Sequence, residues 1–98
     1  MDDDKKNAKT ELIVKLQDII EYETYVNSDI EIFYKSLSDV IADIQEQTLN
    51  YSSIYRDLKN NMVYIQEQMK SDDTYYDQIV VRDCIVTLEE IIVYLNDN

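Results

Sequence analysis

The sequence contains no glycine, proline, histidine or tryptophan, and it contains a single cysteine. Glycine and proline are the usual residues of tight turns, β-hairpins and helix C-caps, so their absence argues against a sheet. A chain without them favours helices joined by few connections. We therefore predict an all-α protein, and its 98 residues suffice for one small domain.

The missing residue types also exclude most enzymatic chemistry. Without histidine the chain has no histidine base, no Ser-His-Asp triad and no histidine metal ligand. Without glycine it has no phosphate-binding loop and no dinucleotide fingerprint. Carboxylates remain as acid–base candidates, but they are scattered over predicted helix surfaces, where solvation is their ordinary role. We expect no enzymatic activity, no cofactor and no metal site.

The single cysteine, Cys84, rules out an intrachain disulfide. It lies among Val80, Leu88 and Ile91 at helical spacing, on the apolar face of a predicted helix. We therefore expect a small buried hydrophobe in preference to a reactive thiol.

The formal charge of the chain is −12, with 21 acidic and 9 basic residues. Such a surface repels nucleic acid and anionic membranes, so we expect no direct binding to nucleic acid. Charged residues interrupt the most apolar stretch, 79–95, and we predict no membrane insertion. The N-terminus does not resemble a signal peptide, so we expect a cytoplasmic protein, with secretion without a signal peptide left open. The abundance of residues with AT-rich codons (Ile, Asn, Lys and Tyr) favours an origin in a virus, a phage, a mobile element or a low-GC bacterium.

One apolar stripe dominates the sequence between residues 29 and 70. Its members recur at every third or fourth position, as one face of a helix does, and a continuous helix of this length would span roughly 63 Å. The stripe consists of Phe33, Leu37, Ile41, Ile44, Thr48, Tyr51, Tyr55, Leu58, Met62, Ile65 and Met69. We predict an elongated, coiled-coil-like antiparallel bundle of three helices, over 10–26, 29–70 and 74–96, with the long helix in the centre.

Two other arrangements stay open, a two-helix hairpin and a four-helix bundle with a break near Asn50. The break between the first and second helices is expected at Asn27 and Ser28, where Ser28 and Glu31 have the spacing of a capping box. The alternative is one helix that runs straight through this segment. Thr10 is the expected N-cap of the first helix. Residues 1–9 lack an apolar period, and we predict a disordered charged tail there, followed by a single helical domain over 10–96.

The apolar faces of the second and third predicted helices are wider than one neighbouring helix can cover, which favours a homodimer or a helical hetero-partner. Tyrosine is common in binding hot spots because its ring is apolar and its hydroxyl tolerates water, and the chain has nine tyrosines. The predicted function is a non-enzymatic protein–protein interaction module. The tyrosines proposed to contact the partner are Tyr34, Tyr51, Tyr55 and Tyr64.

A second hypothesis concerns Asp39, Asp43 and Glu46, which recur at i, i+4 and i+7 on the long helix. Successive carboxylates would lie roughly 5–6 Å apart along the helix axis, a spacing similar to that of phosphates along a DNA strand. An acidic helix of this kind could occupy a basic nucleic-acid-binding cleft. The alternative function is therefore an acidic DNA mimic that inhibits a nucleic-acid-binding protein of host defence.

In size and helical character the chain resembles the small helical partners of type VII secretion systems. Residues 25–29 fit the Tyr-x-x-x-Asp/Glu export pattern, with Tyr25 and Asp29 at its ends. The Trp-x-Gly turn of the best-known group is absent, because the chain has neither residue. The resemblance implies a third function, that of a helical targeting or chaperone partner for a secreted effector.

Overall fold

The computed structural model describes residues 2–26, 30–49, 52–70 and 74–97, with side chains for 7–24, 30–49, 53–70 and 78–97. Four α-helices account for nearly all of them: α1 (Asp2–Val26), α2 (Ile30–Gln47), α3 (Ser52–Met69) and α4 (Thr74–Asp97). Outside these helices the described residues are Thr48, Leu49 and Lys70, and none of the described residues forms a strand. The prediction of an all-α protein is confirmed.

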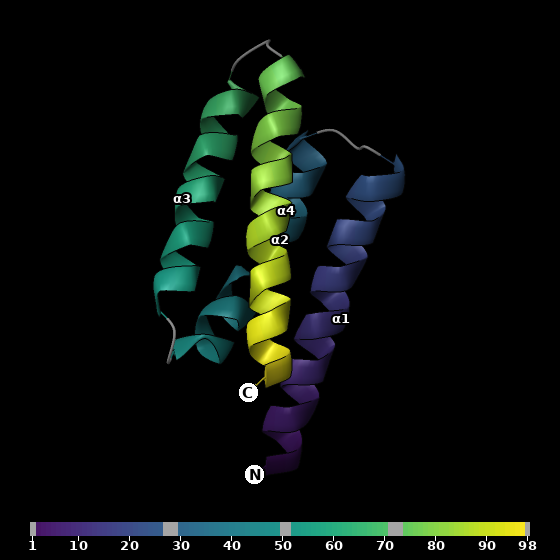
Figure 1. The fold of residues 1–98 in the computed structure, drawn as a ribbon, viewed down its shortest axis with the longest axis vertical. Coiled ribbons are helices and arrows are strands. Elements are labelled where there is room, and N and C mark those ends of the chain that lie inside the picture. Colours follow the sequence, from purple (N-terminus) through teal and green to yellow (C-terminus); the bar gives the residue numbers. More distant parts are fainter. Residues whose placement is uncertain (1, 27–29, 50–51, 71–73, 98) are drawn as a thin grey trace.

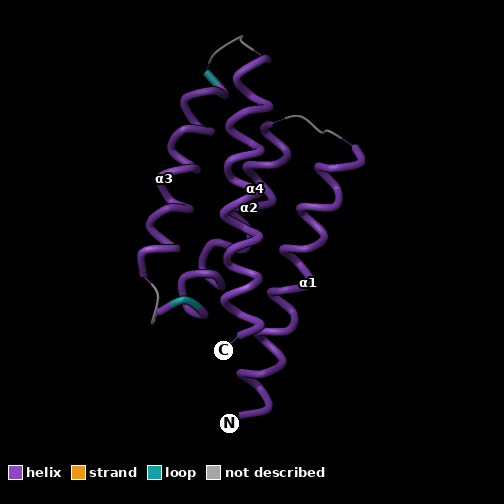
Figure 2. The backbone as a smooth tube through the Cα atoms, in the orientation of Figure 1, coloured by secondary structure: helices purple, strands orange, loops and turns teal. Residues whose placement is uncertain are grey.

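The four helices run up, down, up and down, so that each is antiparallel to the next (Figure 1). Each helix packs against its neighbours around the bundle, α1 on α2, α2 on α3, α3 on α4 and α4 on α1. In addition, α2 and α4 contact each other across the centre. The tube trace in Figure 2 shows the same reversals, with both termini at one end of a body measuring 47 × 26 × 19 Å.

The prediction of one long central helix over 29–70 is wrong. The chain instead forms two helices there, because α2 ends at Gln47 and α3 begins at Ser52. Each half carries its own apolar face, and folding back buries the two faces against each other and against α4. The alternative with a break near Asn50 has the observed number of helices, although Asn50 itself lies outside the described residues.

The first helix begins at Asp2, eight residues before the expected N-cap Thr10, which lies inside α1. The structure thus assigns helix to most of the segment that we expected to be a disordered tail. The sequence offers a physical reason, because Asp2, Asp3 and Asp4 occupy the helix N-terminus, where the dipole favours negative charge. Lysines follow three and four residues later, a spacing that supports helices. The domain bounds of 10–96 stay a prediction.

The other predicted helix ends agree closely with the structure. The first helix ends at Val26 and α2 begins at Ile30, while the expected capping residues Asn27 and Ser28 lie outside the described residues. The reversal between α1 and α2 is clear from their packing, because Lys15 of α1 reaches Asp43 of α2. The last helix, predicted over 74–96, is observed as Thr74–Asp97.

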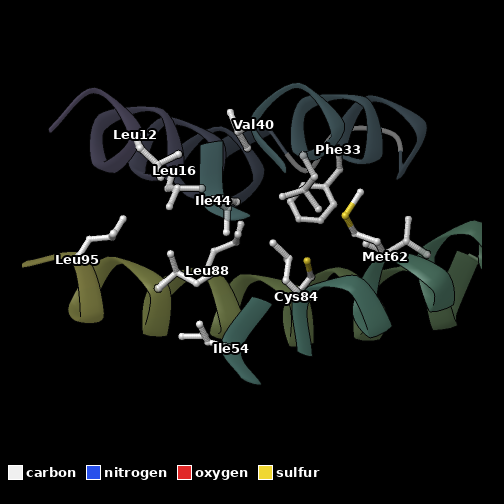
Figure 3. Close-up of a cluster of buried hydrophobic side chains, with 14 of the residues drawn as sticks. Leu12, Leu16, Phe33, Val40, Ile44, Ile54, Met62, Cys84, Leu88 and Leu95 are labelled. Atoms are coloured by element: carbon white, nitrogen blue, oxygen red, sulfur yellow. The ribbon is translucent and has the colours of Figure 1, made fainter. Parts of the chain in front are cut away.

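The core is a continuous apolar cluster to which all four helices contribute (Figure 3). Its buried members are Leu12, Leu16, Ile30, Phe33, Leu37, Val40, Ile44, Ile54, Leu58, Met62, Ile65, Cys84, Leu88, Ile91 and Leu95. Most of the predicted stripe is among them, and Ile41, Tyr55 and Met69 pack partly buried against the cluster. Tyr51 lies outside the described residues.

Polar contacts between the helices fix their register. The amide Nδ2 of Asn61 in α3 donates a 2.7 Å hydrogen bond to the hydroxyl of Thr87 in α4. Gln66 Nε2, also in α3, donates to the Tyr34 hydroxyl in α2. Because these bonds are directional, sliding one helix past another would break them.

Candidate functional site

The outward face of α4 carries an exposed apolar row. Ile79, Val86 and Val93 follow one another at intervals of seven residues, and their exposed fractions are 42%, 49% and 59%. On an α-helix, residues two positions away from buried ones point to the opposite side, and Val86 stands two positions from both Cys84 and Leu88. These three residues, the α4 outer row, thus form a second apolar face on a helix whose first face lies in the core.

An open groove of about 600 Å³ adjoins the α4 outer row, between α3 and α4. It is lined by Ile54, Val86, Glu89, Glu90, Val93 and Tyr94. Ile54 is buried and forms an apolar part of the lining, whereas the two glutamates are exposed. Val86 and Val93 belong to both the row and the groove, so the two features form one continuous surface.

The tyrosines proposed from the sequence are not gathered on one patch. Tyr34 and Tyr55 are half-buried and pack against the core, whereas Tyr64 is 59% exposed. Tyr64 precedes Gln66 by two residues, so it points away from the Tyr34 side of α3. Tyr55 precedes Gln66 by eleven residues, which places it about 16 Å along the axis from the Tyr34 contact.

The three acidic residues of the DNA-mimic hypothesis are all exposed, and we call them the α1–α2 acidic edge. Asp39, Asp43 and Glu46 follow one side of α2, the side that faces α1 at the Lys15 contact. Lys15 Nζ lies 3.8 Å from Asp43 Oδ2, and both side chains are about half exposed. A pair exposed to this degree is weak, but it places a positive charge at the middle of the acidic row.

Among the described residues, no group of three or more His, Cys, Asp and Glu side chains is arranged to hold a metal ion. None of the described helices combines the length and apolar character needed to span a bilayer. Cys84 is fully buried, and desolvation raises the pKa of its thiol to about 12. The expected burial of this small side chain is confirmed. A buried, neutral thiol is a poor nucleophile.

The sequence-based interpretation found the apolar face of the last helix wider than one neighbouring helix can cover, but it did not single out Val86 and Val93. The missed signal is the repeat of seven residues. Residues seven positions apart lie nearly in line along a helix, so Ile79, Val86 and Val93 share one side of α4. That row lies on the opposite side from Cys84, Leu88, Ile91 and Leu95.

Of the groups proposed from the sequence, the structure brings Asp39, Asp43 and Glu46 together on one edge, and it separates Tyr34 from Tyr64. The export pattern at 25–29 includes three residues outside the described part of the chain. Comparisons with protein-family models, with curated proteins and with solved structures found no match to this chain.

Proposed function

We propose that this chain is a non-enzymatic helical module that binds another protein, and that the α4 outer row is its principal contact surface. The observation that carries the proposal is the spacing of Ile79, Val86 and Val93, three β-branched side chains exposed at heptad positions. Single exposed apolar residues are normal on protein surfaces, but three in one line along a helix form an extended apolar surface of the kind that partners cover. The adjoining groove enlarges that surface with further apolar lining.

The energetics support the same assignment. Burying an exposed Val or Ile side chain contributes about 1.5–3 kcal/mol when burial is complete. The three residues of the row are about half exposed, so a covering helix would recover part of this for each of them. The partner is either a helix of another protein or a second copy of the chain, as the sequence already indicated.

Affinity purification from the native host with three matched baits tests the proposal. The baits are the wild-type chain, Val86→Asp and Val14→Asp. Val14 and Val86 are equally exposed, at 49%, and each has an acidic residue three positions before it and four positions after it. The two variants therefore introduce the same charge in the same local setting on different helices.

We expect a protein that is captured by the wild type and by Val14→Asp, and lost with Val86→Asp. Circular dichroism of each bait checks that the helices are intact. Retention of every captured protein by folded Val86→Asp would refute the α4 outer row as the contact surface.

The exposure of all three acidic-edge carboxylates favours a second candidate function, the inhibition of a nucleic-acid-binding protein by phosphate mimicry. Reversing Asp39, Asp43 and Glu46 to Lys should abolish such an interaction, and added salt should weaken it by screening. The control reverses three other exposed acidic residues, Glu21, Asp57 and Glu67. Equal loss of binding in both triple variants would indicate attraction by net charge alone and would rule out the edge as a specific mimic.

A further inference from the structure

The α4 outer row has two charged flanks, and their composition indicates what covers it. Arg82 and Glu89 lie on one flank, seven residues apart, and Asp83 and Glu90 lie on the other. All four side chains are exposed. In a pair of packed helices, residues that flank the apolar seam face the flanks of the partner and determine which partner is accepted. One flank here is mixed in charge and the other is entirely acidic.

From this pattern we infer that the α4 outer row binds a basic amphipathic helix, an assignment that rests on the proposed function and specifies its partner. Such a helix presents an apolar heptad row to Ile79, Val86 and Val93. It carries lysine or arginine opposite Asp83 and Glu90, where the acidic flank requires positive charge. A basic side chain of the partner also reaches Glu89, which lines the groove together with Glu90.

A second copy of the chain could cover the apolar row, but its charges do not complement those of the two flanks. In an antiparallel pair centred on Val86, Arg82 would face Glu89 of the second copy, but Asp83 would face Glu90 of the second copy. In a parallel pair, Glu89 would face an acidic residue of the second copy. Each attractive contact is therefore accompanied by a repulsive one, and each chain brings a net charge of −12.

The two occupants respond to salt in opposite directions. Attraction between the acidic flank and a basic helix is weakened by screening, so that complex dissociates as salt is added. Repulsion between two chains of −12 is also weakened by screening, so self-association strengthens with salt. The sign of the salt dependence thus identifies the occupant independently of affinity.

The experiment uses the full chain and a synthetic three-heptad peptide with leucine at the a and d positions and lysine at e and g. One control peptide has the same composition in scrambled order, and the other has glutamate in place of lysine. Binding is measured by fluorescence anisotropy against wild type, Val86→Asp and Val14→Asp. We expect the lysine peptide to bind the wild type and Val14→Asp with the same affinity. Its affinity for Val86→Asp, and the affinity of each control peptide for the wild type, should be lower by about tenfold or more.

Equal binding of the scrambled peptide would show attraction by bulk charge and overturn the inference, as would unchanged binding to Val86→Asp. Sedimentation of the chain alone supplies the other test. A dimer that strengthens with salt and is lost in Val86→Asp would assign the row to a second copy. If the native-host partner depends on Val86 but the lysine peptide does not bind, the proposed function stands and the basic-helix assignment fails.

Discussion

At the scale of single residues, the position of a side chain around its helix decides whether it is buried. Leu49 and Leu58 are both leucines within the predicted long helix, yet Leu49 is 72% exposed and Leu58 is fully buried. The reason is phase, since Leu49 follows the buried Thr48 and points away from the core. Thr48 satisfies its hydroxyl locally by donating to the Ile44 carbonyl at 2.7 Å, so a polar residue is accommodated in the core.

We predict that Leu58→Ala lowers the free energy of unfolding by about 2–5 kcal/mol, because it removes buried methyl groups and leaves a cavity. The matched substitution Leu49→Ala should change it by less than about 0.5 kcal/mol, as expected for a surface site. Urea denaturation followed by circular dichroism measures both. Similar losses for the two variants would mean that Leu49 is covered in solution.

The thiol of Cys84 leads to a prediction about pH. The ordinary pKa of a cysteine is 9.0, and burial raises the pKa of Cys84 to about 12. The folded state therefore holds the proton more tightly than the unfolded state, so the contribution of the thiol to stability is complete below pH 9 and is lost as the pH rises toward 12. When the pKa differs by one between the two states, the difference in free energy is about 1.4 kcal/mol.

Cys84→Ala removes this titration while the other titrating groups remain. We expect the stability advantage of the wild type over Cys84→Ala to shrink by about 2 kcal/mol between about pH 8 and pH 10.5. Denaturation in the presence of a reductant measures the difference at each pH. Parallel pH profiles for the two proteins would contradict the burial of the thiol.

At the scale of elements, each helix of the bundle has apolar residues at helical spacing, and this spacing explains what the sequence could and could not predict. Phe33, Leu37 and Ile44 of α2, like Leu58 and Ile65 of α3, are buried as their spacing indicates. The sequence analysis favoured one long helix over a chain reversal between α2 and α3. The helical spacing of apolar residues continues from one helix into the next, and no glycine or proline marks a turn.

The binding surface was harder to predict than the core. Periodicity shows that α4 has apolar residues on more than one face, but it cannot show which face the other helices cover. That depends on the packing of α1 and α3 beside α4, a tertiary property. For the same reason, the sequence alone could not show that Tyr34 and Tyr55 pack against the core while Tyr64 stays exposed.

The hydrogen bond from Asn61 to Thr87 links α3 to α4, and a double-mutant cycle can measure its contribution to stability. We predict that Asn61→Ala costs about 1 kcal/mol in the wild-type background, since the bond is neutral and partly buried. In a Thr87→Val background, where the acceptor is gone, the same substitution should cost less. An equal cost in both backgrounds would show that Asn61 acts through contacts other than this bond.

At the scale of the whole molecule, charge is unevenly distributed over the bundle. The α3 helix carries two basic and two acidic residues, whereas α4 carries one basic and five acidic residues. Four acidic residues and one basic residue lie on α2. The charges of α3 sum to zero, so the whole net charge of −12 comes from the rest of the chain. Folding brings these like charges closer together, and the resulting repulsion opposes the hydrophobic core.

We predict that the melting temperature rises when salt is added from low ionic strength to about 0.15 M, where charges more than about 8 Å apart are screened. At low salt, Asp39→Asn should also raise it, because one repelling charge is removed. Asp43→Asn should raise it less, because that change also removes the attraction to Lys15 at 3.8 Å.

The expected shifts are small, about 2 °C for a change of about 0.4 kcal/mol in a domain of this size. Both differences from the wild type should disappear at high salt, where the repulsion that they relieve is already screened. Thermal melts followed by circular dichroism at the two ionic strengths measure all three proteins. A melting temperature that is insensitive to salt would show that repulsion is a minor term in the stability of the bundle. A loss of stability in Asp39→Asn at low salt would show that this carboxylate of the acidic edge is held by attractive contacts.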